Sequence, residues 1–419
     1  MKVALCWTAA LMLATGILAS AEDIPRKPTP LIQLLAEAEA NNTQISSADL
    51  SWKAATHVAQ QVTTLPDPQF TVQQFSVGSP KPFAGFSNSD FAYIGFGASQ
   101  DLPYPGKLRL KGETANREAD TQHAQADVLR TSVAEQVKLL YLRLAYLDAT
   151  LAILQRNDAV LRPLIENGIS RYSLGQGSQA EVLKAQIEHT RLLREITLQH
   201  EEMGQLQAGL KQLLHRSQGS DDIMPEQLAA TPLRYTSQEL QALAQDHNPA
   251  VHMDANAVQK QDAQLKSAQR DGKPDFNVGY MFQQTGSGYR DYYMLTLNMR
   301  LPRRKRVKGE IAEAAELLDR SKQELDSQVQ QQLAEVQKQY VTATSTAELL
   351  KEYQEGLLPQ AEAAFHSEQA AYQSNKQQFA PVLASLLDVL SFERDYQQAL
   401  LDHETALARL ETLTGATLR

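Results

Sequence analysis

The chain has 419 residues, enough for two or three ordinary domains, and carries a formal net charge of −9. An acidic chain is a poor partner for nucleic acid, so we expect no nucleic-acid binding. Much of the sequence consists of Ala, Gln, Glu and Leu, and only 6% of it is aromatic. This composition is typical of long helices.

Residues 1–21 are predicted to be a secretory signal peptide. One lysine is followed by a short apolar stretch and then by Ala19-Ser20-Ala21, a typical cleavage site. The alternative is an N-terminal membrane anchor, for which the stretch is short. The single cysteine, Cys6, would be removed with the signal, and the residue before it is too large for a lipidation signal. We therefore expect an exported chain that is not lipidated and has no disulfide.

The rest of the chain is predicted to contain two copies of one unit. The stretch "QDLPYPGKLRLKGE" (100–113) is echoed by "NMRLPRRKRVKGE" (298–310), and "RYSLGQGSQAEVL" (171–183) by "AYQSNKQQFAPVL" (371–383). The distance between matching residues drifts along the chain, as short insertions after an old duplication would produce.

Each unit is predicted to contain a helix, two strands joined by a glycine-rich loop, a Leu-Pro break and long helices. The first unit spans residues 22–230 and the second spans residues 231–419. In chain order, the predicted elements are a helix at about 31–64, strands at about 69–77 and 91–101 and long helices at about 107–216, then a helix at about 237–270, strands at about 275–284 and 291–301 and long helices at about 305–415.

The long helices carry a heptad pattern. Apolar residues alternate spacings of four and three, which predicts coiled-coil packing of helical hairpins. Without a proline before Pro163, the helix that starts near Lys107 is predicted to run for about 60 residues, or roughly 90 Å. The seam of this helix consists of Val133, Val137, Leu140, Leu144, Leu147, Leu151 and Leu154.

The strands show a different period. Tyr293, Leu295 and Leu297 alternate with Thr296 and Asn298. Each stretch has about the 9–11 residues that a tilted strand needs to cross a membrane, although a half-buried sheet of a soluble domain would show the same alternation. Aromatic residues gather at the loop ends, where an aromatic girdle would lie: Phe83, Phe86, Phe91, Tyr289 and Tyr292.

Four strands cannot close a barrel around a pore, and an open sheet in lipid would leave backbone groups unpaired. Membrane strands would therefore require oligomerisation, and three copies give twelve strands. The predicted fold class is mainly α with a membrane β portion, in which four strands per protomer join a 12-stranded β-barrel and the helices form a periplasmic tube.

Three stretches carry a family resemblance: "YSLGQGSQAEVLKAQ" (172–186), "LPYPGKLRLKGE" (102–113) and "ALARLETLTG" (406–415). Together they resemble the TolC-like outer-membrane efflux family, and the second resembles its heavy-metal branch. The resemblance implies a homotrimer in the outer membrane of a Gram-negative bacterium, surrounded by outer-membrane lipid. It also implies two partners, a periplasmic adaptor and an inner-membrane resistance-nodulation-division pump.

The function implied by this resemblance is a passive exit duct for substrates that the pump exports, such as copper, silver, cobalt, zinc or cadmium cations. Drug efflux, type I protein secretion and a soluble periplasmic coiled-coil scaffold are the alternatives. No H-E-x-x-H, P-loop or G-x-S-x-G motif occurs, and His252-Met253 is an isolated pair on a predicted helix. We therefore expect no enzyme activity, no cofactor and no resident metal.

The turns at the two hairpin tips are expected to face the adaptor by resemblance, although a plain helix–helix turn would also explain their glycines. The tip residues are Arg171, Tyr172, Ser173, Leu174, Gly175, Gly177, Asn375 and Lys376. The family often places an acidic ring just beyond the second tip, but Pro381 and Ala384 stand there. We therefore expect Glu181, Lys184 and Asp388 to form the periplasmic gate.

The Leu-Pro elements are predicted to be junctions between strand and helix, because proline cannot donate to a strand ladder and favours extended backbone before it. The junction residues are Leu102, Pro103, Pro105, Gly106, Leu301 and Pro302. The basic residues that follow, from Lys107 to Lys111 and from Arg303 to Lys308, either meet anionic lipid groups or simply begin a solvated helix.

Overall fold

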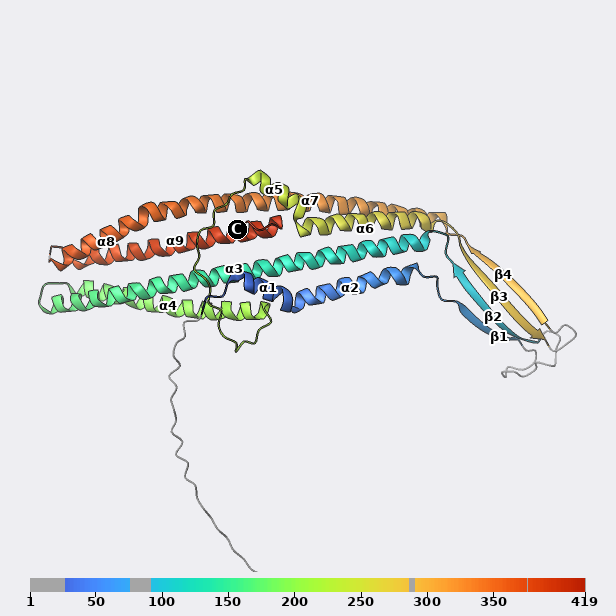
Figure 1. Ribbon diagram of the computed structural model, residues 1–419, viewed down its shortest axis with the longest axis horizontal. Helices are drawn as coiled ribbons and strands as arrows, with labels where there is room; N and C mark the ends of the chain where they lie inside the picture. Colours follow the sequence, from blue (N-terminus) through green and yellow to red (C-terminus); the bar gives the residue numbers. More distant parts are fainter. Residues whose placement is uncertain (1–26, 76–91, 286–290, 375, 419) are drawn as a thin grey trace, which may run out of the picture.

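The computed structural model describes residues 27–75, 92–285, 291–374 and 376–418. It is a long rod of helices with a small sheet at one end (Figure 1). Several predictions fall on residues outside this described part: the signal peptide, the loop aromatics Phe83, Phe86, Phe91 and Tyr289, and the tip residue Asn375.

The two halves of the chain follow the same order of elements. The first half consists of α1 (Leu31–Asn41), α2 (Thr43–Thr63), β1 (Gln69–Phe75), β2 (Tyr93–Leu102), α3 (Lys107–Ser173) and α4 (Gln179–Leu213). The second half consists of α5 (Ser237–His247), α6 (Pro249–Asp271), β3 (Asp275–Thr285), β4 (Asp291–Arg300), α7 (Arg304–Glu352), a π-helical turn (Tyr353–Leu357), α8 (Leu358–Gln373) and α9 (Phe379–Thr414).

Two kinds of helix packing build the rod. Toward the sheet, α3 packs against α2 on one side and α6 on the other, and α6 packs against α7. Away from the sheet, α3 pairs with α4 and α8 pairs with α9, and these two hairpins lie side by side (Figure 1). The rod therefore has a sheet end and a tip end, with α1, α5 and the C-terminus near its middle.

The predicted heptad seam of α3 forms the core of the rod. Val133, Val137 and Leu144 are buried in one apolar cluster with Leu210 of α4, and Leu147 packs in a neighbouring cluster. Charge at Leu144 or Leu147 would therefore disrupt packing within the chain itself.

The predicted helices at 31–64 and 237–270 are each two helices, which corrects the sequence interpretation. The break falls at Asn42 in the first half and at Asn248 in the second half. Both residues have extended backbone, and both side chains accept hydrogen bonds from the first N–H groups of the helix that follows. Each asparagine is thus an N-cap that ends one helix and starts the next.

Each hairpin helix also contains a proline before its tip. Pro163 lies inside α3, and Pro359 follows the π-helical turn Tyr353–Leu357 at the start of α8. Proline removes one backbone donor and crowds the preceding turn, which a π-helical turn can accommodate. The path of the chain changes direction between α7 and α8 at this point (Figure 1).

Residues 214–236 connect the halves and are fixed across the helices by buried polar groups. The N–H of Thr231 donates to Glu404 Oε1 at 2.8 Å, and Thr231 O lies 2.8 Å from Nε2 of His403. The N–H of Glu226 donates to the Tyr141 hydroxyl at 2.8 Å. These bonds satisfy polar groups that burial would otherwise leave unpaired.

Candidate functional site

The four strands form one antiparallel sheet in the order β1-β2-β3-β4. Across β3 and β4, Val278 lies opposite Leu297 and Tyr280 lies opposite Leu295. Because side chains alternate between faces, one face of the sheet collects the apolar residues. Its exposed members are Phe70, Val72, Phe96, Tyr280, Tyr293, Leu295, Leu297 and Met299.

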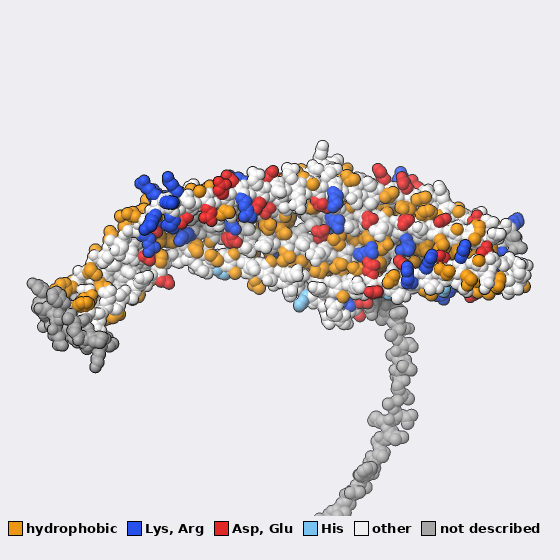
Figure 2. All heavy atoms as spheres, turned by 180° about the vertical axis from the view of Figure 1, so that it is seen from behind, with side chains coloured by type: hydrophobic (Ala, Val, Ile, Leu, Met, Phe, Trp, Pro, Cys, Tyr) orange, Lys and Arg blue, Asp and Glu red, His pale blue; other side chains and the backbone are white. Residues whose placement is uncertain are grey.

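No helix of the described chain covers this apolar face. Leu297, near the middle of β4, is 69% exposed. Hydrophobic side chains gather over the sheet in the space-filling view (Figure 2). An uncovered apolar face of this kind is typical of a surface that meets lipid or another protein.

The opposite face of the sheet is polar and rich in glycine toward the helices, and carries Phe75, Tyr93, Met281, Tyr292 and Met294 toward the loop end. Asn277 lies opposite Asp101 on β2 and opposite Asn298 on β4. Its Nδ2 donates to Asp101 Oδ1 at 2.9 Å, and its Oδ1 accepts from Asn298 Nδ2 at 3.4 Å. We call Asp101, Asn277 and Asn298 the polar ladder. The sheet thus has the two chemically different faces expected of a lipid-facing and a water-facing surface.

Among the described residues, none of the helices combines the length and the apolar character needed to cross a membrane.

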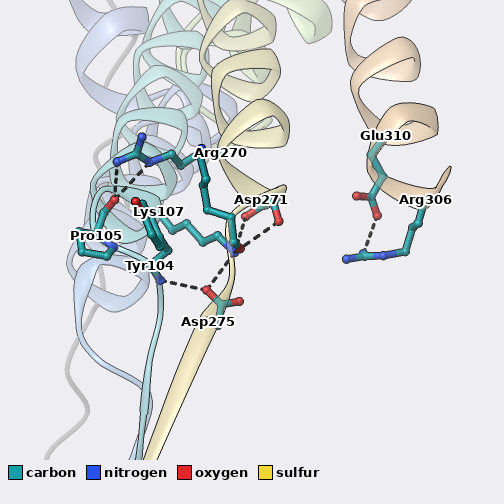
Figure 3. A network of polar contacts seen from close by, with 9 residues as sticks. Tyr104, Pro105, Lys107, Arg270, Asp271, Asp275, Arg306 and Glu310 are labelled. Carbon is teal, nitrogen blue, oxygen red and sulfur yellow. Dashed lines mark hydrogen bonds and ion pairs between the residues drawn. The ribbon is translucent and has the colours of Figure 1, made fainter. Parts of the chain in front are cut away.

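The junction of β2 and α3 is tied to the second half of the chain through Lys107. This side chain is only 5% exposed, and its Nζ lies 2.9 Å from Asp275 Oδ1 and 2.7 Å from the carbonyl oxygen of Lys273 (Figure 3). The same Asp275 oxygen accepts the N–H of Tyr104 at 2.9 Å. Lys107 is therefore buried against the second half of the chain, and it neither begins a solvated helix nor is free to meet lipid groups.

The predicted junction residues lie in this same network. Leu102 ends β2, and Pro103 and Pro105 follow it in the turn. Arg270 of α6 donates twice to Pro105 O, at 2.7 and 3.2 Å, and its guanidinium lies 5.0 Å from the Tyr104 ring centre (Figure 3).

Gly106 is the N-cap residue of α3 and has a φ of 92°, a conformation that glycine adopts without strain. A Cβ at this position would also lie 3.2 Å from the guanidinium of Arg270.

The second junction is built differently. Leu301 and Pro302 follow β4, and α7 begins at Arg304. The side chains of Arg303, Arg304 and Lys305 are all exposed there. Figure 2 shows Lys and Arg side chains gathered beside the sheet. Within the described part of the chain, no residues bury Arg303, Arg304 and Lys305 in the way that Lys107 is buried.

The two hairpin tips meet at the far end of the rod. Arg171 Nη2 donates to Tyr372 O at 2.6 Å, and its guanidinium carbon lies 4.0 Å from the centre of the Tyr372 ring. Burial raises the pKa of the Tyr372 phenol, and the Glu181 carboxylate acts in the same direction, whereas Arg171 opposes both. Arg171 therefore links the first tip to the second through its contacts with Tyr372.

The remaining tip residues are more open. Ser173 ends α3, and Leu174, which caps it, is exposed; Gly175 follows with a φ of 72°. Tyr172 is also exposed, and Gly177 and Lys376 line a cavity of about 690 Å³ between the tips.

The structure separates Asp388 from the other two expected gate residues, which lie three residues apart on α4. Glu181 lies in the first turn of α4 and lines the cavity between the tips, together with Lys376. Lys184 is exposed on the same helix. Asp388 is exposed on α9, seven residues beyond Pro381, the counterpart of Glu181. Seven helical residues span roughly 10 Å, so Asp388 and Glu181 lie at different levels of the rod.

Two features of the site escaped the sequence interpretation. The acceptors around Lys107 lie more than 160 residues away along the chain, at Asp271 and Asp275. The role of Tyr372 as a binding platform for Arg171 depends on the same kind of distant contact. Only the alignment of the two tip motifs, which brings Tyr172 and Tyr372 into register, pointed toward that tyrosine.

Solved structures share this arrangement. The chain is similar to the outer-membrane channel OprN, with a TM-score of 0.79 and 16% identity over 93% of this chain and 91% of that chain. It is similar to the outer membrane protein VceC of Vibrio cholerae, with a TM-score of 0.78 and 17% identity over 93% of this chain and 97% of that chain. For CusC, which forms a transmembrane channel, the TM-score is 0.76 at 16% identity, with 92% and 91% covered.

No protein-family model and no curated protein sequence matches the chain. At these low identities the solved structures establish the fold. The chain has the fold of the TolC-like outer-membrane channels, so the predicted fold class of long helical hairpins with a four-stranded sheet is confirmed.

Proposed function

We propose that the chain is one subunit of a homotrimeric channel in the outer membrane of a Gram-negative bacterium. The observation that carries this proposal is the sheet, which has an uncovered apolar face, a polar opposite face and two open edges. Edge strands in lipid must be paired, because hydrocarbon offers their backbone groups no partner. Three copies supply twelve strands, enough for a closed barrel with an aqueous interior.

We also propose that the helical rods of the three copies form a tube below the barrel. Four helices of one copy lie side by side next to the sheet, so three copies supply twelve helices that continue the barrel as a tube. The polar face of the sheet would then line the same passage. Such a duct conducts substrates passively. Its contacts with the cargo must be weak, so that the cargo can leave at the far end.

We infer that the duct serves an efflux system with a periplasmic adaptor, which the tips would contact, and an inner-membrane pump. The junction motif at residues 102–113 favours heavy-metal cations as cargo, whereas drug efflux and type I protein secretion remain the alternatives. Among the described residues no group of three or more His, Cys, Asp or Glu side chains could hold a metal ion.

The test of this proposal is a matched pair of substitutions on β4. Leu297→Arg places a charge on the apolar face, and we expect it to destabilise the membrane-inserted protein by about 2–4 kcal/mol. Thr296→Arg, at the adjacent position on the polar face, should cost far less. The measurement is the denaturation midpoint of protein recovered from the outer-membrane fraction.

A soluble periplasmic scaffold would give a different result. It would remain in the soluble fraction, and both arginine variants would behave alike. Either finding would overturn the channel proposal. If the protein does reach the membrane, growth on metal salts or drugs tests its role in efflux.

A further inference from the structure

The two duplicated halves contact each other along one boundary within the chain, which we call the β2–β3 seam. There β2 of the first half pairs with β3 of the second half, and α3 packs against α6. The open edges, β4 and β1, are the counterparts of β2 and β3. We propose that β4 pairs with β1 of the next copy in the register of the β2–β3 seam. This inference rests on the proposed trimer.

The register follows from the matched residues of the two halves. Leu102 matches Leu301 at the two Leu-Pro junctions, and Phe276 matches Phe70 at the starts of the corresponding strands. Inside the chain, Leu102 lies opposite Phe276. Leu301 therefore lies opposite Phe70 of the next copy. The antiparallel register then places Met299 opposite Val72 and Asn298 opposite Gln73.

The faces of the sheet provide an independent check on this register. Met299 and Val72 both belong to the apolar face, and Asn298 and Gln73 both belong to the polar face. A slip by one residue would place apolar side chains opposite polar ones. The inferred register also extends the polar ladder, because the amide of Gln73 follows Asn298 across the seam.

The junctions support the same seam. Lys107 matches Arg304, since both begin the helix that leads to a shared Lys-Gly-Glu. The acceptors of Lys107 lie in residues 271–275, whose counterparts are residues 65–69. Leu65 and Gln69 stand where Asp271 and Asp275 do. Asp67, which matches Lys273, is the one carboxylate of that stretch.

Arg304 and Asp67 are both exposed, and within the described residues neither has an ion-pair partner. We infer that Arg304 forms an ion pair with Asp67 of the next copy. The second junction is then stabilised by a contact between subunits. The clamp of Arg270 on Pro105 has no counterpart there, because Thr64 stands where Arg270 does.

Cysteine cross-linking tests the register. The sole native cysteine lies in the predicted signal peptide, so Cys6→Ser gives a background without thiols. Neighbouring antiparallel pairs alternate between wide and close spacing, so one of two adjacent pairs can form a disulfide. The matched pairs are Asn298→Cys with Gln73→Cys and Met299→Cys with Val72→Cys.

The slipped controls keep the faces but move two residues along β1. They are Asn298→Cys with Thr71→Cys and Met299→Cys with Phe70→Cys, whose Cα atoms would lie about 7–8 Å apart, beyond disulfide reach. Each single-cysteine variant controls for random collision.

We expect covalent dimers and trimers, and nothing larger, from at least one matched pair, with none from the slipped pairs. Cross-links from the slipped pairs in protein that still forms trimers would overturn the register and leave the channel proposal standing. Monomeric protein without cross-links in any variant would overturn both.

Charge reversal tests the junction separately. Arg304→Asp and Asp67→Arg should each lower the yield of trimer about two- to fivefold, because each places like charges together at an exposed site. The double variant should restore the yield. If the double variant is as poor as the single variants, the Arg304–Asp67 contact is overturned.

Discussion

At the scale of single residues, Asn42 and Asn248 perform one role twice. Each caps the helix that follows it, and each Nδ2 donates to the carbonyl oxygen of a leucine at the end of a long helix of its own half. The bond from Asn42 to Leu213 is 3.0 Å long, and the bond from Asn248 to Leu413 is 2.8 Å long. One side chain therefore sets both the bend between short helices and their position on the rod.

We predict that Asn42→Ala lowers the free energy of unfolding by about 2 kcal/mol, since it removes the cap and the bond to Leu213. Asn42→Asp keeps the accepting oxygen but loses the donor, so it should cost about half as much. Thermal unfolding of purified protein measures both. Equal losses from the two variants would show that the cap contributes nothing here.

The gate remains a proposal, and its residues can be tested one at a time. Glu181 lies beside the tip cavity, so three copies would place carboxylates around the narrow end and favour cations. We predict that Glu181→Gln weakens block by multivalent cations in single-channel recordings. Asp388→Asn should have a smaller effect, because Asp388 lies at a different level.

Glu201→Gln provides the matched control for this measurement, since Glu201 is an exposed carboxylate on α4 twenty residues farther from the tip. Unchanged block in the Glu181 and Asp388 variants, alone and together, would place the constriction elsewhere.

At the scale of elements, one glycine fixes the approach of α2 to α3. A Cβ at Gly112 would lie 2.3 Å from Cγ2 of Thr63. The Thr63 hydroxyl donates to Ala59 O at 2.8 Å, which restrains the side chain in this position. Gly309 is the counterpart in α7, and a Cβ there would meet nothing within 4 Å.

We predict opposite signs for alanine at the two positions. Gly309→Ala should stabilise the protein by up to about 1 kcal/mol through helix propensity. Gly112→Ala should destabilise it, because the clash outweighs the same gain in propensity. Adding Thr63→Ala should recover most of the loss. The readout is the unfolding temperature, and a stabilising Gly112→Ala would contradict the close approach.

How far the sequence predicts these elements depends on how local their signals are. Heptad spacing and alternating strands predicted the long helices and the sheet, because both periods are visible within one stretch of chain. The bends at Asn42 and Asn248 were missed because an asparagine inside an apolar pattern is compatible with either a cap or a helix surface. The Lys107 site could not be predicted, since its acceptors come from the other half of the chain.

At the scale of the whole molecule, the proposed barrel pairs the two open sheet edges between copies. We predict that protein extracted in mild detergent has the mass of three chains, because three copies close twelve strands. Analytical ultracentrifugation with density matching of the detergent measures this mass. A stable monomer of the unaltered protein would contradict the closed barrel.

The open edges also have a consequence for biogenesis. In the proposed trimer, each chain carries an uncovered apolar sheet until three chains meet, and its border strands can template pairing with any extended peptide. Slow assembly in water would therefore lead to aggregates built from the same contacts that close the barrel. The competition between these outcomes depends on how long a subunit stays alone, so a chaperone that shields β1 and β4 would raise the yield of channel without altering its final stability.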